Sequence, residues 1–278
     1  MNQIPIRRSQ RTLLARLLVF ALVTSLLVAC ATSPTGRRQL MLVSEDSAIA
    51  SSKEAYVSTV SELQKEGKLS SDQALVRRVE RITGRLITEA IAMRPDSADW
   101  EWSVVVIDDP QVNAWCMAGG RMAMYTGLVN TIQPTDDELA QVMGHEIAHA
   151  LANHSAEKMS VQMASSIGVA AVGIFADNKA IATSGAALAA VYAVNMPNSR
   201  TAETEADRIG IELAAKAGFD PRAAATLWAK MAKDGGASPP QFLSTHPDPA
   251  NRQKKLAELE PEMMRYYDPK APHPVYPL

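Results

Sequence analysis

The chain has 278 residues, of which 47% are hydrophobic and 21% charged, an ordinary globular composition that excludes wholesale disorder. Its formal net charge of −2 is uneven, because the first 29 residues carry four arginines and no acid, which leaves −6 for the rest. A mildly acidic body gives no electrostatic reason to expect nucleic acid as a partner.

Residues 1–29 have the features of a signal peptide. Arginines precede an apolar run at 17–29, which suits a signal-peptide core and is too short to span a bilayer comfortably. The run ends in Leu-Val-Ala followed by Cys30, which resembles the bacterial lipobox, where the signal is cut before a cysteine that then carries lipid. We therefore expect attachment to the membrane of the bacterial cell envelope through lipidated Cys30, facing the periplasm. By resemblance to the lipoproteins of enteric bacteria, Ala31 in place of Asp favours sorting to the outer membrane. An ordinary signal peptide or an uncleaved anchor is the alternative.

The first half of the remaining chain combines helices with a small sheet. Residues 30–44 are expected to be a lipid anchor and tether. Helical patterns follow over 44–66, with Ser44 as N-cap, and over 71–93. Three extended segments follow, and a Gly119-Gly120 turn joins the last two. They predict a small antiparallel sheet. These segments are 102–107, 112–117 and 121–125.

The second half is predicted to be helical. The predicted helices are 136–153, 201–217, 221–233 and 249–259. Two apolar, Ala/Gly-rich stretches at 161–176 and 180–196 are interpreted as a helical hairpin that packs in the core, lies over the site or touches a membrane surface. The Pro-rich tail at 263–278 has no clear structure, and Cys116 is expected to be a lone, buried thiol.

The helix at 136–153 contains His145-Glu146-Ile147-Ala148-His149. Residues i and i+4 lie on one helix face, about 6 Å apart along the axis, so two imidazoles can converge on one zinc ion. Glu146 projects beside them, where it can take a proton from a water activated by the metal. The helix has apolar flanks, and buried histidines and a glutamate need partners there. The alternative is a helix with satisfied surface or core histidines.

A catalytic zinc needs a third protein ligand. The longer metzincin motif would have glycine and histidine where this chain has Ala152 and Ser155, so that class is disfavoured. His154 stands one position off and is interpreted as a helix-end histidine.

The third ligand is therefore sought in the helix at 201–217. Glu203 can complete the site, and Asp207, one helical turn later, can accept a hydrogen bond from a ligand histidine and fix its tautomer. Glu205 is two positions from Glu203 and is expected to point elsewhere. A solvated acidic face paired with Arg208 is the alternative.

These motifs resemble the HtpX/Oma/CAAX-prenyl-protease family of gluzincin zinc metallopeptidases, peptidase family M-48. The likeness covers about residues 36–260 and implies a zincin-like domain. It implies one Zn²⁺ per subunit on His145, His149 and Glu203, with Glu146 as the general base and Asp207 supporting a ligand histidine.

The resemblance also assigns residues outside the metal motif. The strand at Asn113 and Ala114 matches the edge that pairs with an extended substrate. His246, in Ser-Thr-His-Pro, matches a residue that approaches the zinc or steadies the transition state, and Arg252 matches its companion. Relatives often have proline where this chain has Ala118, which leaves the substrate-facing details open.

We thus expect an α+β, mainly α, metallopeptidase domain over 45–262. The expected activity is zinc-dependent endoproteolysis of polypeptide substrates, in particular of misfolded or damaged cell-envelope proteins. Two alternatives remain. One is an envelope assembly factor with chaperone-like function and a closed zinc site, acting with envelope assembly machinery; the other is a structural zinc protein with four protein ligands.

Overall fold

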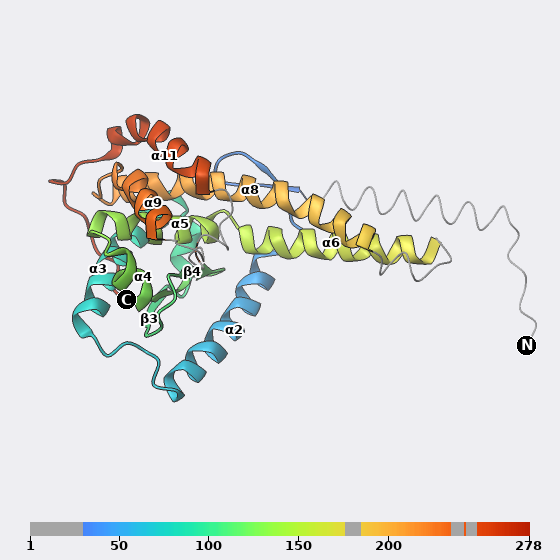
Figure 1. Ribbon diagram of the computed structural model, residues 1–278, viewed down its shortest axis with the longest axis horizontal. Helices are drawn as coiled ribbons and strands as arrows, with labels where there is room; N and C mark the ends of the chain where they lie inside the picture. The colour runs from blue at the N-terminus through green and yellow to red at the C-terminus, as the bar shows by residue number, and fades with distance from the viewer. Residues whose placement is uncertain (1–29, 176–184, 235–241, 243–248) are drawn as a thin grey trace, which may run out of the picture.

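Helices make up most of the chain, and two small sheets accompany them in a mainly helical α+β fold (Figure 1). The computed structural model describes residues 30–175, 185–234, 242 and 249–278. The elements are β1 (Cys30–Thr32), β2 (Arg38–Leu40), α2 (Glu45–Lys65), α3 (Gln73–Met93), η1 (Pro95–Asp99), β3 (Ser103–Ile107), β4 (Ala114–Met117), β5 (Arg121–Tyr125), α4 (Thr126–Ile132), α5 (Asp136–Leu151), α6 (His154–Phe175), α8 (Gly185–Lys216), α9 (Ala223–Asp234), α11 (Pro249–Met263) and η2 (Met264–Tyr266). The predicted signal peptide lies outside the described residues.

Local capping signals set the helix starts. Ser44 caps α2 as predicted, because its hydroxyl accepts the backbone N–H of Ser47 at 3.2 Å. At α5, the Thr135 hydroxyl accepts the Glu138 N–H at 3.2 Å, while the Glu138 carboxylate accepts the Thr135 N–H at 2.9 Å. This reciprocal capping box fixes the start of the helix that carries the histidine motif.

The central sheet is mixed, which corrects the prediction of an antiparallel sheet. Its strand order is β3-β5-β4. β4 and β5 form the predicted antiparallel hairpin around Gly119 and Gly120, whose φ angles are +82° and +80°. β3, however, runs parallel to β5. The loop after β3 carries the chain past β5 before β4 begins, and hairpin signals in the sequence do not reveal this crossing.

α6 and α8 lie side by side and extend away from the body as a long helical arm (Figure 1). α8 is one continuous helix from Gly185 to Lys216, whereas the sequence predicted a separate helix at 201–217. α8 packs along both α5 and α6, and this tertiary packing outweighs local helix-ending signals. Residues 176–184, between the two apolar stretches, lie outside the described part. In the described part of the chain, no helix is long and apolar enough to cross a bilayer.

The N-terminal segment expected to be a tether is folded onto the domain. β1 and β2 pair in an antiparallel hairpin that starts at Cys30, opposite Leu40, and β2 packs against α6. The Gln39 side chain is buried, and its amide donates to the Ala152 carbonyl at 2.7 Å. At the other end, the Tyr276 N–H donates to the Gly84 carbonyl at 3.0 Å, so the tail lies along α3.

α5 is the central helix, and it packs against α3, α8, α9 and β4. Its closest neighbour is α8, which it crosses at two glycines. A Cβ atom added at Gly144 would lie 2.8 Å from the Gly210 carbonyl oxygen, and one at Gly210 would lie 2.8 Å from Cα of His145. The missing side chains therefore let the two backbones meet directly beside the histidine motif.

Candidate active site

Three predicted metal ligands come together from two helices. His145 and His149 project from one face of α5, and their Nε2 atoms are 3.0 Å apart. Glu203 of α8 lies opposite them, with Oε2 3.4 Å from His145 Nε2 and Oε1 3.4 Å from His149 Nε2. One ligand atom from each residue lies within 4.8 Å of the others.

The cluster fits a zinc ion in both spacing and chemistry. A tetrahedral zinc with bonds of about 2.0–2.2 Å holds neighbouring nitrogen and oxygen ligands about 3.3 Å apart. The observed separations of 3.0 and 3.4 Å match that spacing. Two imidazoles and one carboxylate are also a ligand set of catalytic zinc sites, in which the fourth position serves water or substrate.

Asp207 sets the orientation of His145. Its Oδ1 atom lies 3.1 Å from Nδ1 of His145. A carboxylate can only accept, so when Nε2 binds a metal, Nδ1 carries the hydrogen and can donate it to Asp207. The i, i+4 spacing on α8 brings both carboxylates to one helix face, as predicted from sequence.

Arg252, at the start of α11, joins the two acidic residues. Its Nε donates to Asp207 Oδ2 at 2.9 Å and its Nη1 to Glu203 Oε2 at 3.1 Å, while Nη2 donates to Asp207 Oδ1. Nη2 also lies 3.1 Å from His145 Nδ1. Burial alone would raise the pKa of Asp207, but the Arg252 charge and the His145 hydrogen bond outweigh it and lower that pKa. The oxyanion role of Arg252 stays a prediction.

Glu146 is buried on the side of α5 that faces β4. Glu146 is close enough to Cys116 of β4 to affect its thiol. Burial raises the pKa of that thiol well above the usual value, and the negative charge of Glu146 raises it further. Cys116 is a buried, free cysteine, as predicted. The predicted general base thus lies on the helix of the two histidines and close to the sheet.

The predicted substrate edge lies at β4, one of the two outer strands of the three-stranded sheet, with Asn113 just before its first residue. The Asn113 carbonyl accepts the Tyr125 N–H at 3.1 Å, and the Asn113 side chain accepts the Ala114 N–H at 3.0 Å. β5 therefore occupies one side of this segment. Next to this segment, the Val112 carbonyl accepts the Phe242 N–H at 3.1 Å. The predicted residue His246 lies outside the described residues.

His154 is a helix-end histidine, as predicted, but sequence reasoning did not place it beside a metal ligand. It is the first residue of α6, and its Nδ1 lies 2.8 Å from Nδ1 of the predicted ligand His149. Glu205 points away from the metal, as expected, and its Oε2 lies 3.2 Å from His154 Nε2. The only sequence signal was a third histidine five positions after His149, at a helix boundary.

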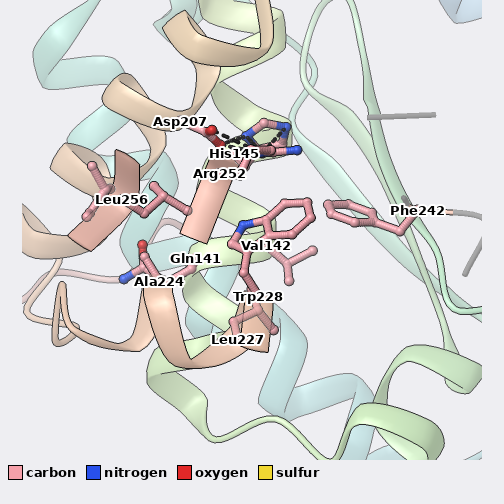
Figure 2. Close-up of a pocket in the computed structure, with 11 residues that line it drawn as sticks. Gln141, Val142, His145, Asp207, Ala224, Leu227, Trp228, Phe242, Arg252 and Leu256 are labelled. Atoms are coloured by element: carbon pink, nitrogen blue, oxygen red, sulfur yellow. Dashed lines mark hydrogen bonds and ion pairs between the residues drawn. The ribbon is translucent and has the colours of Figure 1, made fainter. Parts of the chain in front are cut away.

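A pocket lies behind the metal ligands (Figure 2). The space inside it, counted together with the part open to solvent, is about 300 Å³. His145, Asp207 and Arg252 meet at one end, and the rings of Trp228 and Phe242 line it further down, 5.9 Å apart between centroids. Of the three predicted ligands only His145 lines this pocket, so the pocket lies on the Asp207 side of the metal ligands.

A histidine pair on one helix, a carboxylate from a second helix and a glutamate beside the pair define a metallopeptidase type of site. The family comparison agrees, because the profile described as "Peptidase family M48" matches residues 73–260. This chain belongs to peptidase family M48.

Known relatives align over most of the chain. The mitochondrial metalloendopeptidase OMA1 of Bos taurus is 32% identical over 83% of this chain, and the OMA1 of Schizosaccharomyces pombe is 34% identical over 82%. The putative beta-barrel assembly-enhancing protease of Vibrio cholerae is 32% identical over 75% of this chain. The alignments span 46%, 65% and 43% of these relatives' own lengths.

Proposed function

We propose that this chain is a zinc-dependent metalloendopeptidase, held in the bacterial cell envelope by lipidated Cys30 and acting on damaged or misfolded envelope proteins. The observation that carries the proposal is the spacing of His145, His149 and Glu203, which suits one zinc ion next to the buried carboxylate of Glu146. The names of the relatives, which are metalloendopeptidases and proteases, support the same activity.

In this proposal, His145, His149 and Glu203 would hold a zinc ion, which would supply Lewis-acid chemistry to polarise the scissile carbonyl and to lower the pKa of a water molecule. Glu146 accepts the proton of that water and later delivers it to the leaving amine. The outer edge of β4 near Asn113 and Ala114 holds the substrate main chain by backbone hydrogen bonds, which gives broad sequence tolerance. His246 and Arg252 are the candidates for steadying negative charge in the transition state.

The activity is tested with the full chain purified in detergent. We expect about one zinc per subunit, cleavage of casein and loss of cleavage with a chelator. Glu146→Gln should lower the rate at least about 100-fold while zinc stays bound, because it removes the proton acceptor and no ligand. Glu54→Gln, which changes an exposed glutamate of α2, is the matched control and should cleave normally. Normal cleavage by Glu146→Gln, or in excess chelator, would contradict the proposal.

The attachment is tested by the distribution of the protein between membrane and soluble fractions. Lipidation of Cys30 predicts that Cys30→Ala leaves the protein without acyl chains and unprocessed at the lipobox. Incorporation of labelled fatty acid into wild type and not into Cys30→Ala supports the anchor. Equal labelling of both would rule it out, and separation of the two membranes decides between inner and outer membrane.

A second candidate function is an assembly factor with a closed, regulated zinc site. The Vibrio cholerae relative, named a putative beta-barrel assembly-enhancing protease, favours it. His246 as a fourth ligand would produce that closed state. Casein cleavage that speeds up in His246→Ala would indicate a regulated protease, whereas no cleavage by either protein would favour the assembly factor.

A further inference from the structure

A row of polar contacts leads from the predicted ligand His149 away from the metal position. Nδ1 of His149 lies 2.8 Å from Nδ1 of His154, and Nε2 of His154 lies 3.2 Å from Oε2 of Glu205. His154 and Glu205 are 6% and 5% exposed, so water does not compete for these contacts. Asn153, with φ of +55°, makes the sharp turn that starts α6 at His154. This turn brings the His154 ring against His149.

Donor and acceptor chemistry permits one consistent assignment of hydrogens along this row. If Nε2 of His149 binds a metal, its Nδ1 carries the hydrogen and must donate. Nδ1 of His154 is then the acceptor, and its Nε2 carries the hydrogen that is donated to the Glu205 carboxylate. Each ring nitrogen has one role, and the row ends on a group that can only accept.

The N-terminal hairpin completes the surroundings of Glu205. Arg37 donates from Nε to Glu205 Oε2 at 2.6 Å, and the hydroxyls of Ser33 and Thr35 donate to Glu205 Oε1. The other end of Arg37 makes a bidentate pair with buried Glu157, at 2.7 and 2.6 Å. Burial alone would raise the pKa of Glu205, but the bonds from His154 and the hairpin outweigh it and hold that pKa below its ordinary value.

The two ligand histidines are thus supported in parallel. Asp207 accepts directly from His145, and Glu205 is positioned to support His149 through His154. We propose that His154 and Glu205 are positioning residues for metal ligand His149, and that the docked N-terminal hairpin strengthens metal binding by holding Glu205 in place. This inference rests on the proposed function only in taking the metal to be zinc. Because β1 begins at Cys30, the N-terminal hairpin would link the proposed lipid anchor to the metal centre.

The test is the zinc dissociation constant of the full-length protein in detergent, measured by competition with a chromogenic chelator. His154→Ala and Glu205→Gln should each weaken zinc binding by about 10- to 100-fold, the usual effect of losing such a supporting partner. Arg37→Ala should have a smaller effect, because Ser33 and Thr35 still donate to Glu205. Arg38→Ala, which removes the adjacent, exposed arginine, is the matched control and should bind as wild type does.

A conservative variant separates positioning from simple packing. The Oδ1 atom of asparagine stands near the place of histidine Nδ1, so His154→Asn can still accept from His149 and should recover much of the affinity that His154→Ala loses. Cobalt substituted for zinc should show an altered d–d absorption band in His154→Ala and a near-normal band in His154→Asn. Thermal unfolding of the metal-free proteins verifies that each variant folds.

The outcomes separate this inference from the proposed function. If wild type takes up no zinc, the proposed function fails and this inference fails with it. If wild type binds zinc and His154→Ala binds within twofold of wild type with an unchanged cobalt spectrum, the positioning role alone is overturned. Equal weakening in Arg37→Ala and Arg38→Ala would overturn the part assigned to the hairpin.

Discussion

The Asp207 carboxylate lies 3.1 Å from Nδ1 of His145, across the contact between α8 and α5. With Nε2 of His145 bound to a metal, the carboxylate would accept the hydrogen on Nδ1 and so hold the ring in the ligating orientation. The same α8 face supplies Glu203, so one helix both ligates the metal and orients a ligand from the neighbouring helix.

Asp207→Asn should weaken zinc binding by about 10- to 100-fold, because the amide is a poorer acceptor and no longer balances the Arg252 charge. Chelator competition at neutral pH measures this effect. Glu212→Gln, further along the same helix, is the control. Zinc affinity unchanged in Asp207→Asn would mean that His145 is oriented by other contacts.

Arg252→Met should destabilise the metal-free protein by roughly 3–5 kcal/mol, because it leaves the buried carboxylates of Asp207 and Glu203 without their cation. Bound zinc should restore part of that stability, because its positive charge replaces the charge of the removed guanidinium. Urea unfolding with chelator and with excess zinc measures both effects.

Arg252→Lys is the matched variant for that experiment. It keeps the charge but loses the fork that reaches both carboxylates, so its stability should fall between wild type and Arg252→Met. A metal-free Arg252→Met as stable as wild type would show that the ion pairs contribute little.

Gly210→Ala should lower the free energy of unfolding by about 1–3 kcal/mol, the usual cost of overpacking. Helix propensity alone favours alanine by about 1 kcal/mol, but the new Cβ would lie 2.8 Å from backbone atoms of His145. The same displacement should weaken zinc binding, which chelator competition detects. Thr204→Ala, at an exposed position of the same helix, should have neither effect; a stabilised Gly210→Ala would refute the close contact.

Glu138 should make stability depend on pH. Burial would raise its pKa, but the Lys230 ammonium and the hydrogen bonds from Thr135 and Thr226 outweigh burial and lower it. Its contribution is therefore present above the unfolded carboxyl pKa of about 4.3 and is lost as the pH falls toward the lower folded pKa.

We therefore expect wild type to be more stable than Glu138→Gln at pH 7, and the difference to shrink at about pH 3–4. Denaturant unfolding of the metal-free proteins across this range measures it. Glu54→Gln, on the exposed face of α2, should show no such trend. A difference that is constant with pH would contradict the assignment to this carboxylate.

The sequence by itself determined the parts of the site that lie within one helix. The i, i+4 spacing of His145 and His149, and of Glu203 and Asp207, follows from the helical period, and the cap at Ser44 follows from a side chain next to the helix start. These features depend on covalent neighbours, so they could be predicted before the fold was known.

Only the tertiary structure decided how distant segments meet. It placed β3 parallel to β5, joined the predicted 201–217 helix into α8, brought Arg252 to the α8 carboxylates and set Arg37 on Glu205. Such contacts arise from the packing of whole faces across long stretches of chain, and periodicity within one segment carries no information about them.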